Sequence, residues 1–110
     1  MQKLREHERF VTLGDGQRVF STEVGEGPAV LLCDGLGCDG YIWRHLRPSL
    51  ALNHRVIHWH YRGHGKSDQP TRWELLDVPT LIRDLLAVLD SYDVERCSLL
   101  GHSMGVQVIL

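Results

Sequence analysis

Long hydrophobic runs are absent from this sequence, and so is an excess of charge of either sign. No apolar stretch approaches the roughly 18 residues that a helix needs to cross a bilayer, so we expect no membrane-spanning segment. The formal net charge is −2 and the basic residues are scattered, which excludes the basic patch typical of proteins that bind nucleic acid or anionic membranes. The charged opening segment MQKLREHERF lacks the apolar core of a secretory signal.

Cysteine is scarce, and its spacing predicts neither a disulfide framework nor a metal site. Cys33, Cys38 and Cys97 are an odd number, which fits three free thiols in a reducing compartment and makes the cytoplasm the expected location. His58 and His60 alternate on one strand face, and Cys33, Cys38 and His64 could lie near the same end of the sheet, but the chain has no CxxC pair and no HExxH motif. We therefore expect no bound metal. The glycine-rich segment DGLGCDG lacks GxGxxG and a phosphate-loop lysine, so we expect no nucleotide cofactor.

The chain has instead the composition of an ordinary globular domain, with 43% hydrophobic and 24% charged residues over 110 positions. That length suffices for one domain with a modest core and is too short for two. Two strand-like runs, residues 8–13 and 17–24, flank the tripeptide GDG, a strong hairpin pattern. Residues 29–33 (AVLLC) form a continuous apolar run typical of a strand buried on both faces.

Helices and strands then alternate towards the end of the chain. Apolar residues at helical spacing predict a helix within residues 41–51, which Pro48 keeps short or kinked. Strands are predicted at residues 55–60 and 96–100 on either side of the clearest helix, residues 78–92. The apolar residues of that helix form one stripe, and its polar residues are expected on the opposite face: Arg83, Asp84, Asp90 and Ser91.

The element order is therefore hairpin, strand, helix, strand, helix, strand, helix. Strands that alternate with helices pair in parallel through right-handed crossovers, and the helices cover both faces of the sheet. The sequence predicts an α/β fold with an antiparallel hairpin at its leading edge.

The pentapeptide GHSMG, residues 101–105, follows the last predicted strand and opens the last predicted helix. A sharp strand-to-helix turn holds a serine hydroxyl clear of its surroundings, and only glycine fits two positions before and after that serine. The backbone N–H of Met104 would then face the place where an oxyanion forms. Ser103 is the candidate nucleophile, with Gly101 and Gly105 as the glycines of the turn.

Three segments in this order give the chain a resemblance to the α/β-hydrolase fold family of esterases, lipases and carbon–carbon hydrolases. They are DGLG after the third strand, YRGHGKSD after the fourth and GHSMG after the fifth. The resemblance extends from about residue 8 to residue 110 and implies a mostly parallel sheet in the order 1-2-4-3-5. It also implies that the backbone N–H of Leu36 is the first donor of an oxyanion hole.

The resemblance also implies a structural loop packed beside the serine turn. The family's usual His-Gly after the third strand is Asp34-Gly35 here. A carboxylate at that position suits an oxyanion hole only if it turns away into hydrogen bonds. The loop itself comprises Arg62, Gly63, Gly65, Ser67 and Asp68.

Serine at position 103 separates the chain from some relatives of this fold. Epoxide hydrolases and haloalkane dehalogenases carry an aspartate there, because their intermediate is an alkyl ester. A serine indicates an acyl-enzyme, and hence a small-molecule ester or related acyl substrate. His102 precedes the serine directly and is expected to be a supporting residue, since neighbours on a tight turn point in different directions.

In this fold the catalytic acid and base follow the serine in the chain, so we expect residues 1–110 to be the N-terminal portion of one domain. The first interpretation is a fragment of a serine hydrolase, inactive until a C-terminal half joins it as partner. The second is a non-catalytic fragment or protein-interaction module that keeps the first half of the fold. No cofactor is implied by either.

Overall fold

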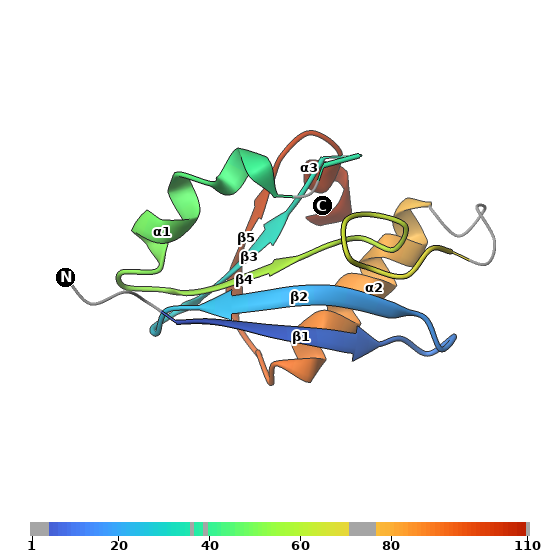
Figure 1. Ribbon diagram of the computed structural model, residues 1–110, viewed down its shortest axis with the longest axis horizontal. Coiled ribbons are helices and arrows are strands. Elements are labelled where there is room, and N and C mark those ends of the chain that lie inside the picture. The colour runs from blue at the N-terminus through green and yellow to red at the C-terminus, as the bar shows by residue number, and fades with distance from the viewer. Residues whose placement is uncertain (1–4, 36, 39, 71–76, 110) are drawn as a thin grey trace.

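The computed structural model describes residues 5–35, 37–38, 40–70 and 77–109. It begins with an antiparallel hairpin formed by β1 (Glu6–Thr12) and β2 (Arg18–Val24). The hairpin is the longest part of the sheet and lies along one side of the molecule (Figure 1). Its turn contains the GDG tripeptide, so the predicted hairpin is confirmed.

Three parallel strands complete the sheet. They are β3 (Ala29–Cys33), β4 (Arg55–Trp59) and β5 (Cys97–Gly101). Strands β4 and β5 both pair in parallel with β3, and β4 also pairs antiparallel with β2. The strand order is β1-β2-β4-β3-β5, which confirms the predicted order.

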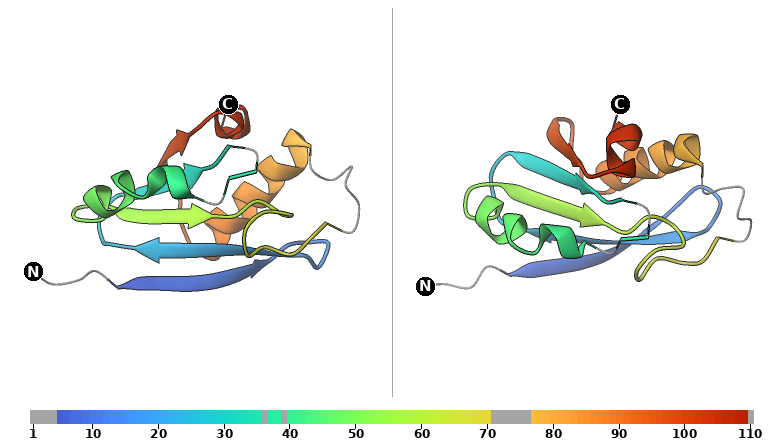
Figure 2. Two further views of the ribbon diagram at one scale, coloured as in Figure 1. Left: turned by 45° about the horizontal axis from the view of Figure 1, so that its top comes forward. Right: turned by 90° about the horizontal axis from the view of Figure 1, so that it is seen from above.

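Helices cover both faces of this sheet. The 3-10 helix η1 (Tyr41–Trp43) and α1 (Leu46–Leu50) lie on one face, and α2 (Val78–Ser91) and α3 (Met104–Ile109) lie on the other (Figure 2). Helix α1 has five residues and contains Pro48, as expected of a segment with proline inside it. Helix α2 begins at Asp77, whose carboxylate accepts a hydrogen bond from the N–H of Thr80 at 2.9 Å.

Two hydrophobic cores fill the space between sheet and helices. Alternate residues of β3 pack into one core or the other, because successive side chains on a strand point to opposite faces of the sheet. Leu31 joins the core under α2 and α3, and Leu32 joins the core under η1 and α1. Both side chains are fully buried, as expected from the continuous apolar run.

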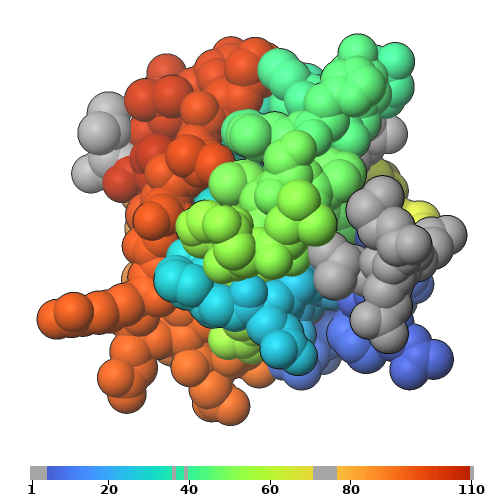
Figure 3. Space-filling model, turned by 90° about the vertical axis from the view of Figure 1, so that its left-hand side faces the viewer, coloured from blue at the N-terminus to red at the C-terminus, as the bar shows by residue number. Residues whose placement is uncertain are grey.

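The turns that lead into the parallel strands gather at one end of the sheet, which faces the viewer in Figure 3. The β2–β3 turn packs there against the turn between α1 and β4, and the N–H of Arg55 donates to the carbonyl of Pro28 at 3.0 Å. The opposite end of the sheet, where β3, β4 and β5 finish, carries the loops described next.

One prediction about α2 is wrong. Asp84 was expected on the polar face of the helix, but its side chain is only 3% exposed, whereas the apolar Leu86 is 54% exposed. Asp84 is turned inward because it pairs with the buried Arg62, in the loop that follows β4.

Candidate functional site

Ser103 lies at a sharp turn between the end of β5 and the start of α3. Its backbone has a φ of 55°, a left-handed conformation that costs a residue with a side chain about 1–3 kcal/mol. The serine is exposed, so its hydroxyl is accessible from outside. The strand-turn-helix context predicted for GHSMG is confirmed, and the role of Ser103 as nucleophile stays a prediction.

Gly101 and Gly105 stand where chain segments almost touch. A Cβ built on Gly101 would lie 2.7 Å from the backbone carbon of Gly105, and a Cβ built on Gly105 would lie 2.2 Å from the carbonyl oxygen of Cys33. Neither distance leaves room for a methyl group. The two glycines therefore allow α3 to start directly against the end of β3, which places the serine at the carboxyl end of the sheet.

The N–H of Met104 has no acceptor among the backbone hydrogen bonds of the described residues at this turn. The next two N–H groups, those of Gly105 and Val106, donate to the carbonyls of His102 and Ser103 at 2.9 and 3.1 Å. A free N–H next to the serine is what an oxyanion hole requires.

The other predicted donor, Leu36, lies outside the described residues, but its neighbours are placed. A Cβ built on Gly35 would be 3.3 Å from the Cβ of Ser103, so this part of the chain lies against the serine. The N–H of Cys38 donates to the carbonyl of Gly35 at 3.2 Å, which closes a tight turn. We call residues 35–38 the oxyanion turn.

Asp34, just before the oxyanion turn, is fully buried and points away from the serine into a set of donors. Its carboxylate accepts from the indole N–H of Trp43 at 2.6 Å and contacts Nε2 of His58 at 2.9 Å. Its backbone carbonyl accepts from the hydroxyl of Tyr61 at 2.7 Å. Burial raises the pKa of that phenol, so Tyr61 keeps its proton and acts as a donor. The carboxylate is thus turned away into hydrogen bonds, as an oxyanion hole here requires.

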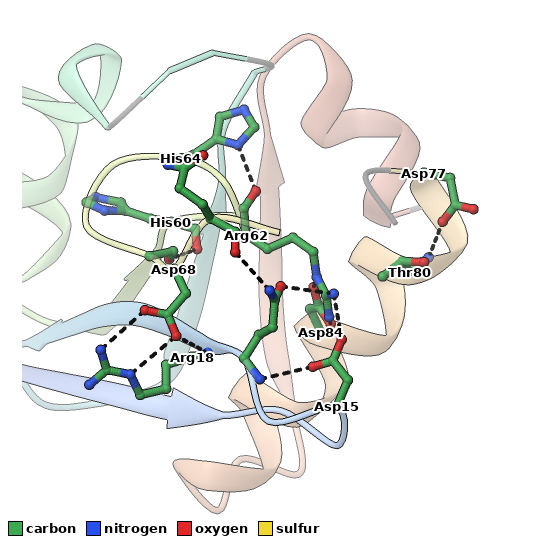
Figure 4. Close-up of polar contacts among 12 residues, drawn as sticks. Asp15, Arg18, His60, Arg62, His64, Asp68, Asp77, Thr80 and Asp84 are labelled. Atoms are coloured by element: carbon green, nitrogen blue, oxygen red, sulfur yellow. Dashed lines mark hydrogen bonds and ion pairs between the residues drawn. The ribbon is translucent and has the colours of Figure 1, made fainter. Parts of the chain in front are cut away.

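The loop that follows β4, residues 61–68, lies at the carboxyl end of the sheet and is fixed by Arg62 (Figure 4). Its packing beside the serine turn stays a prediction. The guanidinium of Arg62 donates two hydrogen bonds to the carboxylate of Asp84 on α2, at 2.7 and 2.8 Å, and one to Asp15 at 2.8 Å. These bonds raise the pKa of Arg62, while burial raises the pKa of Asp84. A buried pair with this two-bond geometry holds the loop to α2.

Ser67 and Asp68 tie the same loop to β2. The hydroxyl of Ser67 donates to the carbonyl of His60 at 2.6 Å and accepts from the N–H of Phe20 at 2.8 Å. The carboxylate of Asp68 pairs with Arg18 at 3.2 Å and also accepts from its backbone N–H, and the pKa of Asp68 is lowered by these bonds. Gly63 and Gly65 take positive φ values of 76° and 50° that turn the chain between these anchors.

Several histidines lie near this edge, and most have ring nitrogens already engaged. His58 contacts Asp34, His60 accepts from the N–H of Lys66 at 3.0 Å, and His64 contacts two backbone groups. His102 is exposed, and its backbone N–H donates to the carbonyl of Cys33 at 3.1 Å.

Metal ligands do not gather in the described part of the chain, which contains no group of three or more His, Cys, Asp or Glu side chains suited to an ion. Cys33, Cys38 and Cys97 form no disulfide with one another in the described part of the chain, and the three thiols stay a prediction. No helix in the described ranges is long and apolar enough to cross a membrane.

Sequence reasoning missed the contacts of three residues that shape this edge: Asp84, Tyr61 and His64. Asp84 had one available signal, since a buried arginine in the loop requires a carboxylate partner. Nothing local to Tyr61 or His64 indicated their contacts with Asp34 and Gly37.

Comparison with known proteins agrees with the fold. The model of the alpha/beta hydrolase fold matches residues 28–109. An uncharacterized protein of Mycobacterium tuberculosis is 37% identical over 98 residues, which is 88% of this chain and 28% of that protein. Epoxide hydrolase B of the same species is 36% identical over 84 residues, or 76% of this chain and 24% of the relative.

Among solved structures, epoxide hydrolase A from Mycobacterium thermoresistibile superimposes with a TM-score of 0.85 at 33% identity. The match covers 96% of this chain and 34% of that one. The chain thus spans about a third of the structures, and less of the curated relatives, that it matches. With the sheet order, the serine turn and the family match in agreement, the chain belongs to the alpha/beta hydrolase fold family.

Proposed function

We propose that Ser103 is the nucleophile of a serine hydrolase that acts on a carboxylic ester or a related acyl compound through an acyl-enzyme. The observation that carries this proposal is the exposed serine held at a φ of 55° between β5 and α3. The strain at that position has no use in packing, because the side chain is exposed, and it is typical of a nucleophile held for attack.

The serine itself argues for acyl chemistry and against the reaction named for several relatives. Attack of an aspartate on an epoxide gives an ester, which water can cleave at its carbonyl carbon. Attack of a serine hydroxyl on an epoxide would give an ether, which has no carbonyl for water to attack. Attack of Ser103 on an ester instead gives a tetrahedral intermediate, then an acyl-enzyme that water hydrolyses. We therefore assign an acyl substrate to this chain although its relatives include epoxide hydrolases.

In this proposal the N–H groups of Leu36 and Met104 stabilise the oxyanion of the tetrahedral intermediate. The N–H of Met104, which has no acceptor among the backbone hydrogen bonds of the described residues at the turn, and the closeness of Gly35 to Ser103 support the assignment. Removing one such donor from a serine hydrolase costs about 100- to 1000-fold in rate. The residues of the 61–68 loop then serve to hold the oxyanion turn in place.

The base and acid that serve Ser103 are proposed to come from a C-terminal half of the domain, which acts as partner to this chain. His58, His60 and His64 have ring nitrogens in other contacts, and in this fold acid and base follow the nucleophile in sequence. We expect little or no turnover from the chain alone. The odd number of cysteines and their spacing fit a reducing compartment, and we propose the cytoplasm as its location.

The test compares wild type, Ser103→Ala and the matched control Ser98→Ala, which alters another exposed serine of the same region. Each is treated with a fluorophosphonate probe and a short activated ester, first alone and then with a C-terminal half of the fold supplied. We expect labelling and turnover only in the completed protein, lost in Ser103→Ala and kept in Ser98→Ala.

Labelling that survives Ser103→Ala in the completed protein would show that the nucleophile is elsewhere. Strong Ser103-dependent turnover by the chain alone would place a base within it. Absence of both labelling and turnover in every form would favour the interaction module, the alternative without catalysis.

A further inference from the structure

His64 occupies a position between the 61–68 loop and the oxyanion turn (Figure 4). Its Nδ1 lies 3.1 Å from the carbonyl oxygen of Arg62, and its Nε2 lies 2.9 Å from the backbone nitrogen of Gly37. One ring nitrogen therefore faces the loop to which His64 belongs, and the other faces a segment 27 residues away in sequence.

These two partners determine where the proton of the imidazole sits. A carbonyl oxygen can only accept, so Nδ1 must carry the hydrogen and donate to Arg62. The N–H of Gly37 can only donate, so Nε2 must be bare and accept. A single neutral tautomer satisfies both contacts, and a proton on Nε2 would face the donor of Gly37 and break the contact.

The loop that carries His64 is well anchored. Arg62 is bonded to Asp84 and Asp15, Ser67 bonds to the backbone of β2, and Asp68 pairs with Arg18. The imidazole ring also packs edge-on against Tyr61, with centroids 5.7 Å apart. His64 thus projects from a rigid support.

The oxyanion turn is held on either side of Leu36 from this one loop. Before the turn, the hydroxyl of Tyr61 donates to the carbonyl of Asp34 at 2.7 Å. After Leu36, the N–H of Gly37 donates to Nε2 of His64. Gly37 is exposed and has a φ of 75°, so the bond to His64 restrains an otherwise permissive backbone.

We propose that His64 is a positioning residue: by accepting the hydrogen bond of Gly37, it fixes the backbone next to Leu36, the proposed oxyanion donor. This inference rests on the proposed function and deepens it. A donor to an oxyanion must be placed to within a fraction of an ångström, because a displacement near 1 Å costs about 100-fold in rate. His64 supplies that placement through Gly37 without touching the substrate.

This assignment opposes a role for His64 as the base of Ser103. A general base needs a nitrogen free to take the proton of the hydroxyl, and the bare nitrogen of His64 already accepts from Gly37. The two roles predict different behaviour of the same ring, so one experiment separates them.

The test uses the isotope-labelled 110-residue chain and three variants, His64→Leu, His64→Gln and the control His45→Leu. Glutamine can reproduce both contacts, since its amide has one donor and one acceptor end, whereas leucine has neither. His45 is exposed, with no side-chain bond at the start of α1. Hydrogen exchange is measured at Gly37, with the fully buried Leu31 of β3 as internal reference.

We expect exchange at Gly37, relative to Leu31, to be about tenfold faster in His64→Leu, which is the effect of losing one neutral hydrogen bond. Exchange should stay near wild type in His64→Gln and His45→Leu. Unchanged exchange at Gly37 in His64→Leu, with Leu31 still protected, would overturn the proposal.

Nitrogen spectra of the wild-type ring give a second readout that needs no variant to fold. We expect protonated Nδ1 and bare Nε2 at neutral pH, and a proton on Nε2 would overturn the proposal. Neither measurement depends on catalysis. Failure of the fluorophosphonate test would refute the role of Ser103 as nucleophile and leave the positioning role of His64 intact. Failure of the exchange test would refute the positioning role of His64 and leave the role of Ser103 intact.

Discussion

Replacing Gly105 with alanine tests whether the serine turn depends on the close approach of α3 to β3. The added Cβ would lie 2.2 Å from the carbonyl oxygen of Cys33, 2.8 Å from its carbonyl carbon and 3.0 Å from the carbonyl oxygen of Asp34. All three are backbone atoms at the end of a central strand, so no side chain can rotate away. Helix α3 must move instead, by roughly 1 Å, to restore normal contact distances.

The magnitude follows from that geometry. Overpacking a tight contact costs about 1–3 kcal/mol, and the upper end applies here because the obstacle is backbone. Small domains have only about 5–15 kcal/mol of stability in all, so the change is large. Movement of α3 carries Ser103 and Met104 with it, and a shift near 1 Å lowers a rate about 100-fold.

The assay is urea unfolding followed by the fluorescence of Trp43 and Trp59, both buried in the folded chain. Gly14→Ala is the matched control, because a Cβ there meets nothing within 4 Å. We expect the free energy of unfolding to fall by about 3 kcal/mol in Gly105→Ala and to stay level or rise by up to about 1 kcal/mol in Gly14→Ala. Equal stability of the two variants would refute the steric argument.

Three further predictions concern charge and thiol chemistry. Arg62→Leu leaves the Asp84 carboxylate buried without its partner and should lower the free energy of unfolding by about 3–5 kcal/mol. Burial raises the pKa of Asp84, so protonation at lower pH removes the unpaired charge. The loss should therefore be smaller at about pH 5 than at about pH 7. The pKa values of Asp15 and Asp68 shift in the opposite direction, because hydrogen bonds from arginines lower them. The stability that these two carboxylates contribute should be present above their ordinary pKa of 3.8 and lost as the pH falls below it, as thermal unfolding would measure. Burial raises the pKa of Cys33 to about 12, so mass spectrometry should find this thiol unalkylated by iodoacetamide in the folded chain and alkylated after unfolding; rapid alkylation in the folded chain would show that β3 is accessible.

The sequence by itself determined the elements, whereas the order in which the strands pair followed from the resemblance to the α/β-hydrolase fold family. The apolar run 29–33 predicted a strand buried on both faces, and the apolar stripe of residues 78–92 predicted the long helix. The glycine spacing around Ser103 predicted a tight turn between strand and helix. Each of these features is set by residues within a few positions of one another, because burial periodicity, helix caps and turns are local properties of the chain.

Only the tertiary structure decided which polar groups meet at the carboxyl end of the sheet. Asp84 reads as a surface residue of an amphipathic helix, and it is buried because Arg62, 22 residues away, reaches it across the sheet edge. Asp34 turns away from the serine because Trp43 and His58 donate to it from two other elements. A buried charge or backbone group must find a partner wherever the fold supplies one, and that choice depends on distances between segments that the linear sequence does not specify.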